Sequence, residues 1–128
     1  MATKKVPPNP VTQSGRDAFA MYVNKWQGAL NLNDWRIQSS NKPASKANMA
    51  EVYKFDLEAR LATYRIGEDF GGTPVTDSSL EDTALHEVLH VFLYELIEFA
   101  KDPASNPKDI ASAEHRVIQT LVHVLTQN

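Results

Sequence analysis

The chain has 128 residues, of which 42% are hydrophobic and 23% are charged, and its formal net charge is −3. These values are typical of one globular domain with a single core. They argue against a nucleic-acid partner, which requires a basic surface, and no apolar run is long enough to span a membrane. The chain has no cysteine, so a bound metal ion must be held by His, Asp or Glu side chains.

Residues 1–13 contain three prolines and few apolar side chains, and we expect them to form a flexible arm. They lack the apolar segment of a secretory signal, which favours a cytoplasmic location. Residues 14–128 are expected to form one domain.

The remaining elements follow from hydrophobic periodicity. Residues 17–30 carry apolar side chains at helical spacing and predict a first helix. Apolar and polar residues then alternate around positions 35–37, 50–57 and 60–66, which predicts three short strands, the last two joined by a tight turn near Glu58 and Ala59. A capping-box pattern at positions 78–81 predicts a long helix over residues 79–101, and a last helix is expected over residues 108–126. The sequence therefore predicts an α+β fold with a sheet that is at least partly antiparallel.

The pattern His86-Glu87-Val88-Leu89-His90 lies inside the long predicted helix. Residues four apart on a helix lie about 40° apart on one face, so both imidazoles can reach one metal ion. Glu87 then lies beside them, where it can take a proton from a metal-bound water. Zinc lowers the pKa of such a water to about 7, so the pattern predicts a zinc site with Glu87 as general base.

A catalytic zinc ion needs a third protein ligand, and the candidates lie on the last helix. On a helical wheel, Glu114 falls within about 40° of Ile118, Leu121 and Leu125, in the middle of the apolar stripe. An unpaired carboxylate there would be costly to bury, and a metal ion would remove that cost. Glu114 is therefore the favoured third ligand, with His115 as the alternative. Without a metal, Glu114 would have to pair with a buried arginine or lie exposed.

Six further side chains have weaker support for a functional role. Asp82 lies one turn before His86 and either orients this imidazole or acts as a first-turn acid. Tyr64 and Tyr94 are candidates to stabilise an oxyanion, although packing is the commoner role. His123 is expected to be exposed, and Trp26 and Trp35 are expected to lie in the core.

The His86–His90 motif, together with the stretches at residues 30–37, 59–66, 80–90 and 114–118, resembles the compact zincin-like proteins of phages and prophages. The resemblance covers residues 15–126. It implies a minimal zincin-like fold of the gluzincin type, with His86, His90 and Glu114 as zinc ligands and Glu87 as general base. No H-x-x-G-x-x-H extension follows the motif, so the pattern is not that of a metzincin.

The sequence thus predicts a zinc-dependent metallopeptidase that acts on a peptide or protein substrate, in the host cytoplasm if a phage encodes it. The alternative is a non-catalytic zincin-like module that binds metal and recognises a host or virion protein. A third reading is an interaction protein without metal, which would not lose stability when a chelator is added.

Overall fold

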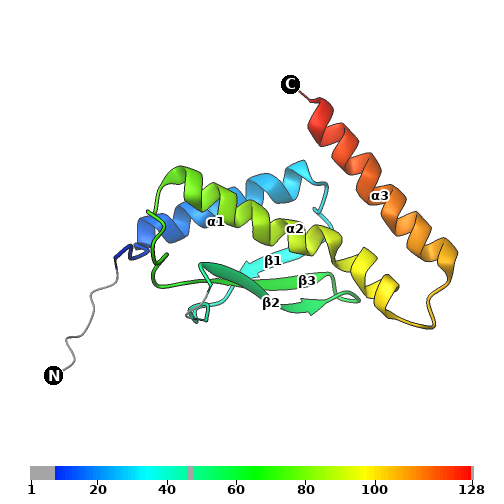
Figure 1. Cartoon of the computed structure of the whole chain (residues 1–128), viewed down its shortest axis with the longest axis horizontal. Coiled ribbons are helices and arrows are strands. Elements are labelled where there is room, and N and C mark those ends of the chain that lie inside the picture. Colours follow the sequence, from blue (N-terminus) through cyan, green and yellow to red (C-terminus); the bar gives the residue numbers. More distant parts are fainter. Residues whose placement is uncertain (1–7, 46–47, 128) are drawn as a thin grey trace.

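The computed structural model describes residues 8–45 and 48–127, so residues 1–7 of the predicted arm lie outside the described part. Its elements follow the order α1 (Gln13–Ala29), β1 (Arg36–Ser39), β2 (Ala50–Asp56), β3 (Leu61–Ile66), α2 (Asp77–Lys101) and α3 (Pro107–Thr126). Three helices and a three-stranded mixed sheet confirm the predicted α+β class. Helices α1 and α2 cover one face of the sheet, and α3 leaves this layer at the C-terminal end of α2 (Figure 1).

The part of the predicted arm that is described is attached to the domain. The Asn9 backbone N–H donates to Asp69 Oδ1 at 2.7 Å, and the Val11 N–H donates to the Glu68 carbonyl at 2.8 Å. Pro10 forms an isolated bridge with Asp69. Residues 9–11 therefore lie along the segment before α2.

The sheet has the strand order β1–β3–β2, with β3 in the middle. Strand β1 pairs with β3 in parallel, and β2 pairs with β3 in antiparallel, with a register shift between Val52 and Lys54. The turn that joins β2 to β3 includes Arg60 at φ +55, as the tight connection required. Strand β2 is thus an edge strand, and it lies beside α2.

The helices begin at polar side chains that accept hydrogen bonds from the first turn. Thr12 caps α1, which starts at Gln13, one helical turn before the start that its periodicity predicted. Helix α2 begins at Asp77, two residues before the predicted start, because Thr76 and Ser79 form the capping box. Asn106 caps α3, and Pro107 occupies its first position.

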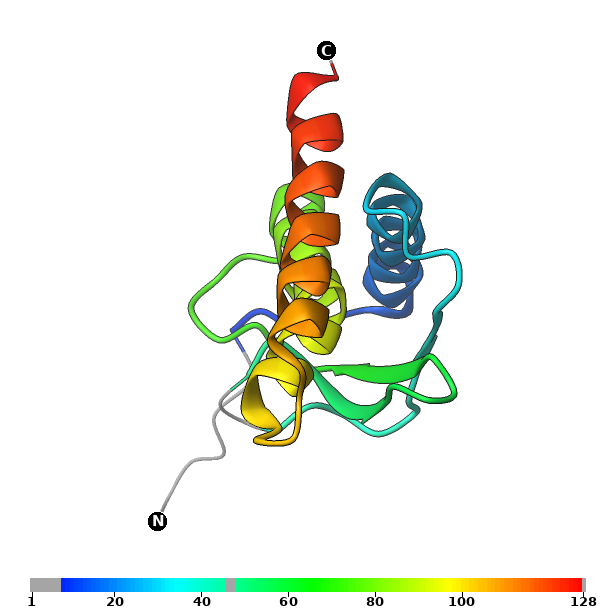
Figure 2. The same cartoon turned by 90° about the vertical axis from the view of Figure 1, so that its right-hand side faces the viewer.

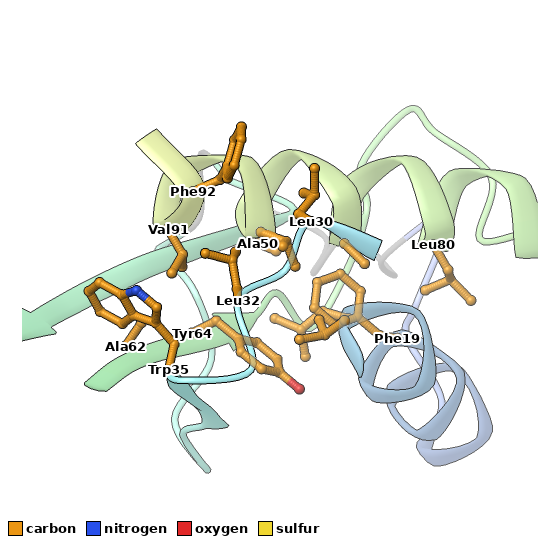
Figure 3. Packing of buried hydrophobic residues seen from close by; sticks show 14 of the residues in the cluster. Phe19, Leu30, Leu32, Trp35, Ala50, Ala62, Tyr64, Leu80, Val91 and Phe92 are labelled. Carbon is orange, nitrogen blue, oxygen red and sulfur yellow. The ribbon is translucent and has the colours of Figure 1, made fainter. Parts of the chain in front are cut away.

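The core lies between α1, α2 and the sheet, as Figure 3 shows for Phe19, Trp35 and Val91. Phe19 of α1 packs on Tyr64 of β3 with ring centroids 5.3 Å apart. Trp35 is buried as predicted, whereas Trp26 is half-buried at the core's margin and donates through Nε1 to Glu81 Oε2 at 3.0 Å.

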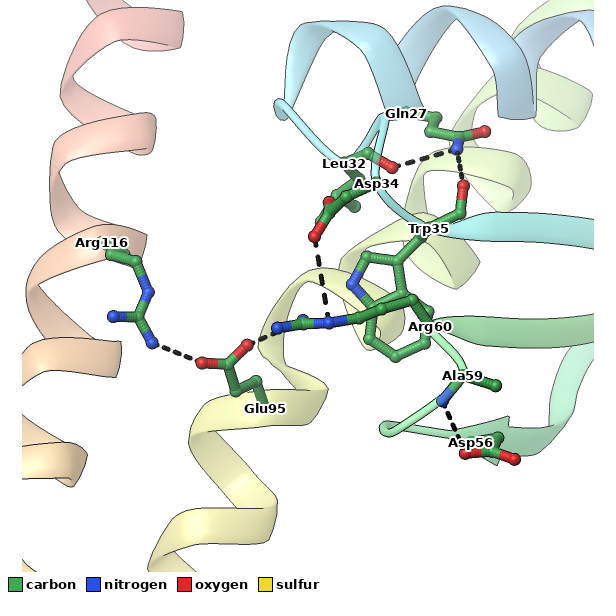
Figure 4. Close-up of polar contacts among 9 residues, drawn as sticks. All are labelled: Gln27, Leu32, Asp34, Trp35, Asp56, Ala59, Arg60, Glu95 and Arg116. Atoms are coloured by element: carbon green, nitrogen blue, oxygen red, sulfur yellow. Dashed lines mark hydrogen bonds and ion pairs between the residues drawn. The ribbon is translucent and has the colours of Figure 1, made fainter.

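Helix α3 has a much smaller share in this core. Only Ala113 among its residues is buried, and three of its apolar residues are partly buried against the core: Val117, Leu121 and Val124. The far end of α3 lies away from the sheet in Figure 2. The Arg116 guanidinium pairs with Glu95 of α2, which also accepts from Arg60 Nη1 at 2.8 Å (Figure 4).

Candidate metal centre

The His86, Glu87 and His90 side chains come together on α2. One ligand atom from each lies within 4.8 Å of the other two, and the imidazole centroids are 4.9 Å apart. Both histidines are exposed, and the His86 side chain has 69% of its surface accessible. The arrangement is one that a metal ion can bind without displacing core side chains.

Glu87 has a different environment from its two neighbours, because it is only 5% exposed. Its Oε1 accepts the Val52 backbone N–H at 2.9 Å, and its Oε2 lies 4.0 Å from His86 Nε2. The Val52 N–H is available because β2 is an edge strand and this group points away from β3. Strand β2 therefore orients the Glu87 carboxyl toward the imidazoles.

Burial raises the pKa of Glu87, and this effect is opposed first by the hydrogen bond from Val52 and then by the nearby histidines. A raised pKa brings a carboxyl group closer to the range in which it exchanges protons at neutral pH. The position of Glu87 thus suits a proton-transfer role as well as a ligand role.

A cavity of about 400 Å³ opens beside His86 and Glu87. Residues 48–50, which lead into β2, line one side, and Asp82 and Thr83 of α2 line the other. Space next to the His86 imidazole would be needed by any substrate that a bound metal ion is to reach.

Glu51 holds the segment that leads into this cavity. Its Oε1 accepts the Ser45 N–H at 3.1 Å and Arg65 Nε at 2.7 Å, and its Oε2 accepts Asn48 Nδ2 at 3.0 Å. These contacts lower the pKa of Glu51, with the Ser45 hydrogen bond as the largest cause. The wall of the cavity is therefore anchored to the sheet by a carboxylate.

The predicted third ligands lie elsewhere. Glu114 and His115 are exposed on α3, outside the group formed by His86, Glu87 and His90. Two of the apolar residues around Glu114 are exposed too, at 49% for Ile118 and 77% for Leu125, whereas Leu121 is partly buried. The cost of burying a carboxylate, which singled out Glu114 in the sequence, does not arise in this arrangement. Its role as a ligand stays a prediction.

The remaining candidates from the sequence lie outside the group formed by His86, Glu87 and His90. Asp82 is exposed at the mouth of the cavity. Tyr64 is buried in the core, where burial raises its pKa, and Tyr94 stacks on Phe55 with centroids 4.1 Å apart. Both tyrosines therefore pack. His123 is exposed on α3, as expected.

The role of Val52 could not be predicted from the sequence, because a backbone N–H bond has no sequence pattern. The burial of Glu87 did have a sequence pattern. Ala84, Glu87, Val88 and Val91 are all buried and follow the spacing i, i+3, i+4, i+7 of the inward face of a helix.

No family model matches the chain, and no curated protein or solved structure is significantly similar to it. The zincin resemblance therefore depends on the motif and on the order of the elements. Within residues 8–45 and 48–127, no helix has both the length and the hydropathy needed to cross a membrane.

Proposed function

We propose that the chain is a zinc-dependent metallopeptidase in which His86 and His90 bind the metal ion and Glu87 is the general base. The observation that carries the proposal is that ligand atoms of His86, Glu87 and His90 lie within 4.8 Å of one another. Glu87 is buried and held by a hydrogen bond from the Val52 N–H. Imidazole nitrogens and carboxylate oxygens are donors that zinc accepts in proteins. Zinc bound there would supply a Lewis acid and a water of lowered pKa.

Glu87 would move the protons of the reaction. Because Oε1 is occupied by the Val52 N–H, Oε2 is the atom free to take a proton from the attacking water. The same atom can then donate that proton to the leaving amine.

A peptide is the substrate class that suits this surface. Strand β2 is an edge strand beside Glu87, and an extended peptide can be added to such an edge through main-chain hydrogen bonds. The Val52 N–H is already bound to Glu87, so the peptide would pair with other outward groups of this strand. The adjoining cavity of about 400 Å³ has room for a substrate side chain.

The third ligand is proposed to come from α3. A catalytic zinc site of this kind uses three protein ligands, and His86 and His90 supply two. The resemblance to gluzincin-type proteins favours Glu114 as the third ligand, and His115 is the alternative.

The second candidate function is a metal-binding module that recognises a protein and cleaves nothing. It is favoured by one observation, the exposure of apolar side chains along α3, at 49% for Ile118, 55% for Val122 and 77% for Leu125. Apolar surface of this kind is common where one protein binds another.

The test combines metal content with peptide cleavage. Protein purified without a metal-affinity tag is assayed for zinc by elemental analysis and for cleavage of a broad peptide library. Glu87→Gln should retain zinc and lose activity by a factor on the order of 10²–10⁴, because it removes the proton acceptor but keeps the side chain's size. Glu98→Gln, on the same helix, is the matched control and should retain activity.

Equal cleavage by Glu87→Gln and the wild type would reject Glu87 as the base. Stoichiometric zinc without cleavage by the wild type would favour the binding module instead.

A further inference from the structure

We propose that the cavity between α2, α3 and residues 30–35 binds a carboxylate that is attached to an apolar body. This site is separate from the candidate metal centre and does not depend on the proposed function. Glu95, which borders the cavity, follows His86 by nine residues and therefore points about 180° away from it around α2. A ligand here would bind on the side of α2 opposite to His86.

The cavity has the size and the lining of a small-molecule site. Its volume is about 720 Å³, and protein pockets for small organic ligands measure roughly 300–1,000 Å³. Phe92 and Leu96 of α2 and Val117 of α3 contribute apolar surface to it. Arg60 and Arg116 line the same space, so the cavity combines apolar walls with two cations. An acid with an apolar body matches both features.

The indole N–H of Trp35 points to the kind of group that the ligand brings. Trp35 is only 5% exposed and lines the cavity. Its backbone takes part in hydrogen bonds, but its indole N–H has no acceptor within residues 8–45 and 48–127. Every completely sealed side-chain nitrogen in that part of the chain does have a partner, so the indole nitrogen is open to the cavity.

Figure 4 shows the indole nitrogen on the side of the Trp35 ring that is nearer to α3. An indole N–H can donate a hydrogen bond but cannot accept one. A ligand that satisfies it must therefore supply an acceptor, as a carboxylate oxygen does.

The two arginines offer further donors to the same space. Arg60 uses Nη1 and Arg116 uses Nη2 to bind the two oxygens of Glu95, whereas Asp34 is 3.9 Å from Arg60 Nε, beyond hydrogen-bond distance. A guanidinium carries several more N–H groups, and none of these has an acceptor in the described part of the chain. Glu95 and Asp34 balance the two positive charges, so directed hydrogen bonds would recognise the ligand rather than a strong net field.

The cavity wall that carries Trp35 is fixed in advance. Gln27 Nε2 donates to the Leu32 carbonyl at 3.0 Å and to the Trp35 carbonyl at 2.7 Å (Figure 4). The Arg60 guanidinium lies over the Trp35 ring, 5.6 Å from its centroid, and this contact holds the two donors next to each other. Binding would therefore require little ordering of side chains, which favours affinity for a small ligand.

Nuclear magnetic resonance of the isotope-labelled full chain tests the site. The chain has two tryptophans and therefore two indole N–H signals, which Trp35→Phe assigns. The probes are octanoate and N-acetyl-leucyl-phenylalanine, two apolar acids from different chemical sources, and the uncharged amide of the same peptide is the control. We expect the acids to move the Trp35 signal downfield. The Trp26 signal should stay in place, because this N–H already donates to Glu81.

A pair of substitutions on α3 tests the contribution of the cation. The Arg116 side chain is 59% exposed, so Arg116→Gln should fold normally. It should weaken binding of the acids by a factor on the order of 10, because it removes a charged hydrogen-bond donor. Lys108→Gln removes a positive charge at an exposed position of the same helix and should leave the affinity unchanged. Unchanged affinity in Arg116→Gln, or equal weakening in both variants, would overturn the proposal.

The probes separate the possible sources of the carboxylate. A response to octanoate alone would identify a free apolar acid as the ligand, and a response to the peptide alone would identify a peptide C-terminus. Equal binding of the peptide amide would overturn recognition of a carboxylate. An unmoved Trp35 signal with both acids at millimolar concentration would reject the site and leave the proposal for the metal centre unaffected.

Discussion

The imidazole face of α2 and the apolar face of α3 carry the two halves of the predicted zinc site, but the two halves differ in burial and in contacts with the rest of the domain. On α2, Glu87 is buried, bonded to β2 and flanked by two imidazoles. On α3, Glu114 is exposed, and so are its apolar neighbours Ile118 and Leu125. The first half of the site is assembled by the same packing that builds the core, and the second half is not.

The difference shows what a motif on a single helix can guarantee. Residues four apart on α2 meet because the helix itself places them on one face. A ligand on another helix also needs that helix to dock in one register, which depends on buried surface between the two elements. Helix α3 fully buries only Ala113 and partly buries three further apolar side chains, so its position relative to α2 is set by few contacts.

The largest expected effect comes from removing one imidazole of α2. His90→Ala should reduce zinc affinity by a factor on the order of 100 or more, because it removes a direct ligand and even outer-shell changes cost 10–100-fold. His123→Ala, on the exposed face of α3, should leave affinity unchanged. Calorimetric titration with zinc measures both, and equal affinity in the two variants would contradict a site on α2.

The α+β class and the long α2 helix could be predicted because their signals are local. Apolar residues along α2 recur at helical spacing, and the helix that they predict contains the whole motif. Its start was less certain, because Thr76, Ser78 and Ser79 all offer capping side chains and only the structure shows that Thr76 is used. The parallel pairing of β1 with β3 had no such signal, since β1 has only four residues.

The candidate site divides in the same way. Spacing alone predicted that His86 and His90 converge. The wheel correctly grouped Glu114 with Ile118 and Leu125, but a wheel does not say whether a stripe is covered. Whether the stripe is covered depends on contacts between residues of α2 and α3. These residues are far apart in sequence, and no periodic pattern marks such contacts. The Val52 N–H bond to Glu87 was unpredictable for the same reason.

A matched pair of valine substitutions tests whether α2 and α3 differ in stability as they do in burial. Val91 of α2 is 1% exposed, and Val122 of α3 is 55% exposed. Val91→Ala should lower the free energy of unfolding by about 1–2.5 kcal/mol, because it leaves a cavity in the core. Val122→Ala should change it by less than about 0.5 kcal/mol. Urea denaturation of the metal-free protein measures both.

An equal loss in the two variants would mean that the apolar face of α3 is covered in solution.

The smallest expected effect concerns the segment that borders the cavity. Hydrogen bonds from Ser45 and Asn48, together with Arg65, lower the pKa of Glu51 in the folded state. A carboxyl with a lowered pKa stabilises the fold above its unfolded pKa of about 4.3, and this contribution is lost as pH falls toward the folded value. The wild type should therefore lose stability below about pH 5, and Glu51→Gln should lose less over the same range.

Urea denaturation at a series of pH values from about 3 to 7 measures how the free energy of unfolding changes with pH. Glu58→Gln is the control, because the Glu58 side chain is exposed in the turn before β3. Identical slopes in the wild type and Glu51→Gln would mean that the Glu51 contacts do not persist in solution. The wall beside His86 would then be as weakly attached as α3, and the contrast between the two halves of the site would be reduced to the Val52–Glu87 bond.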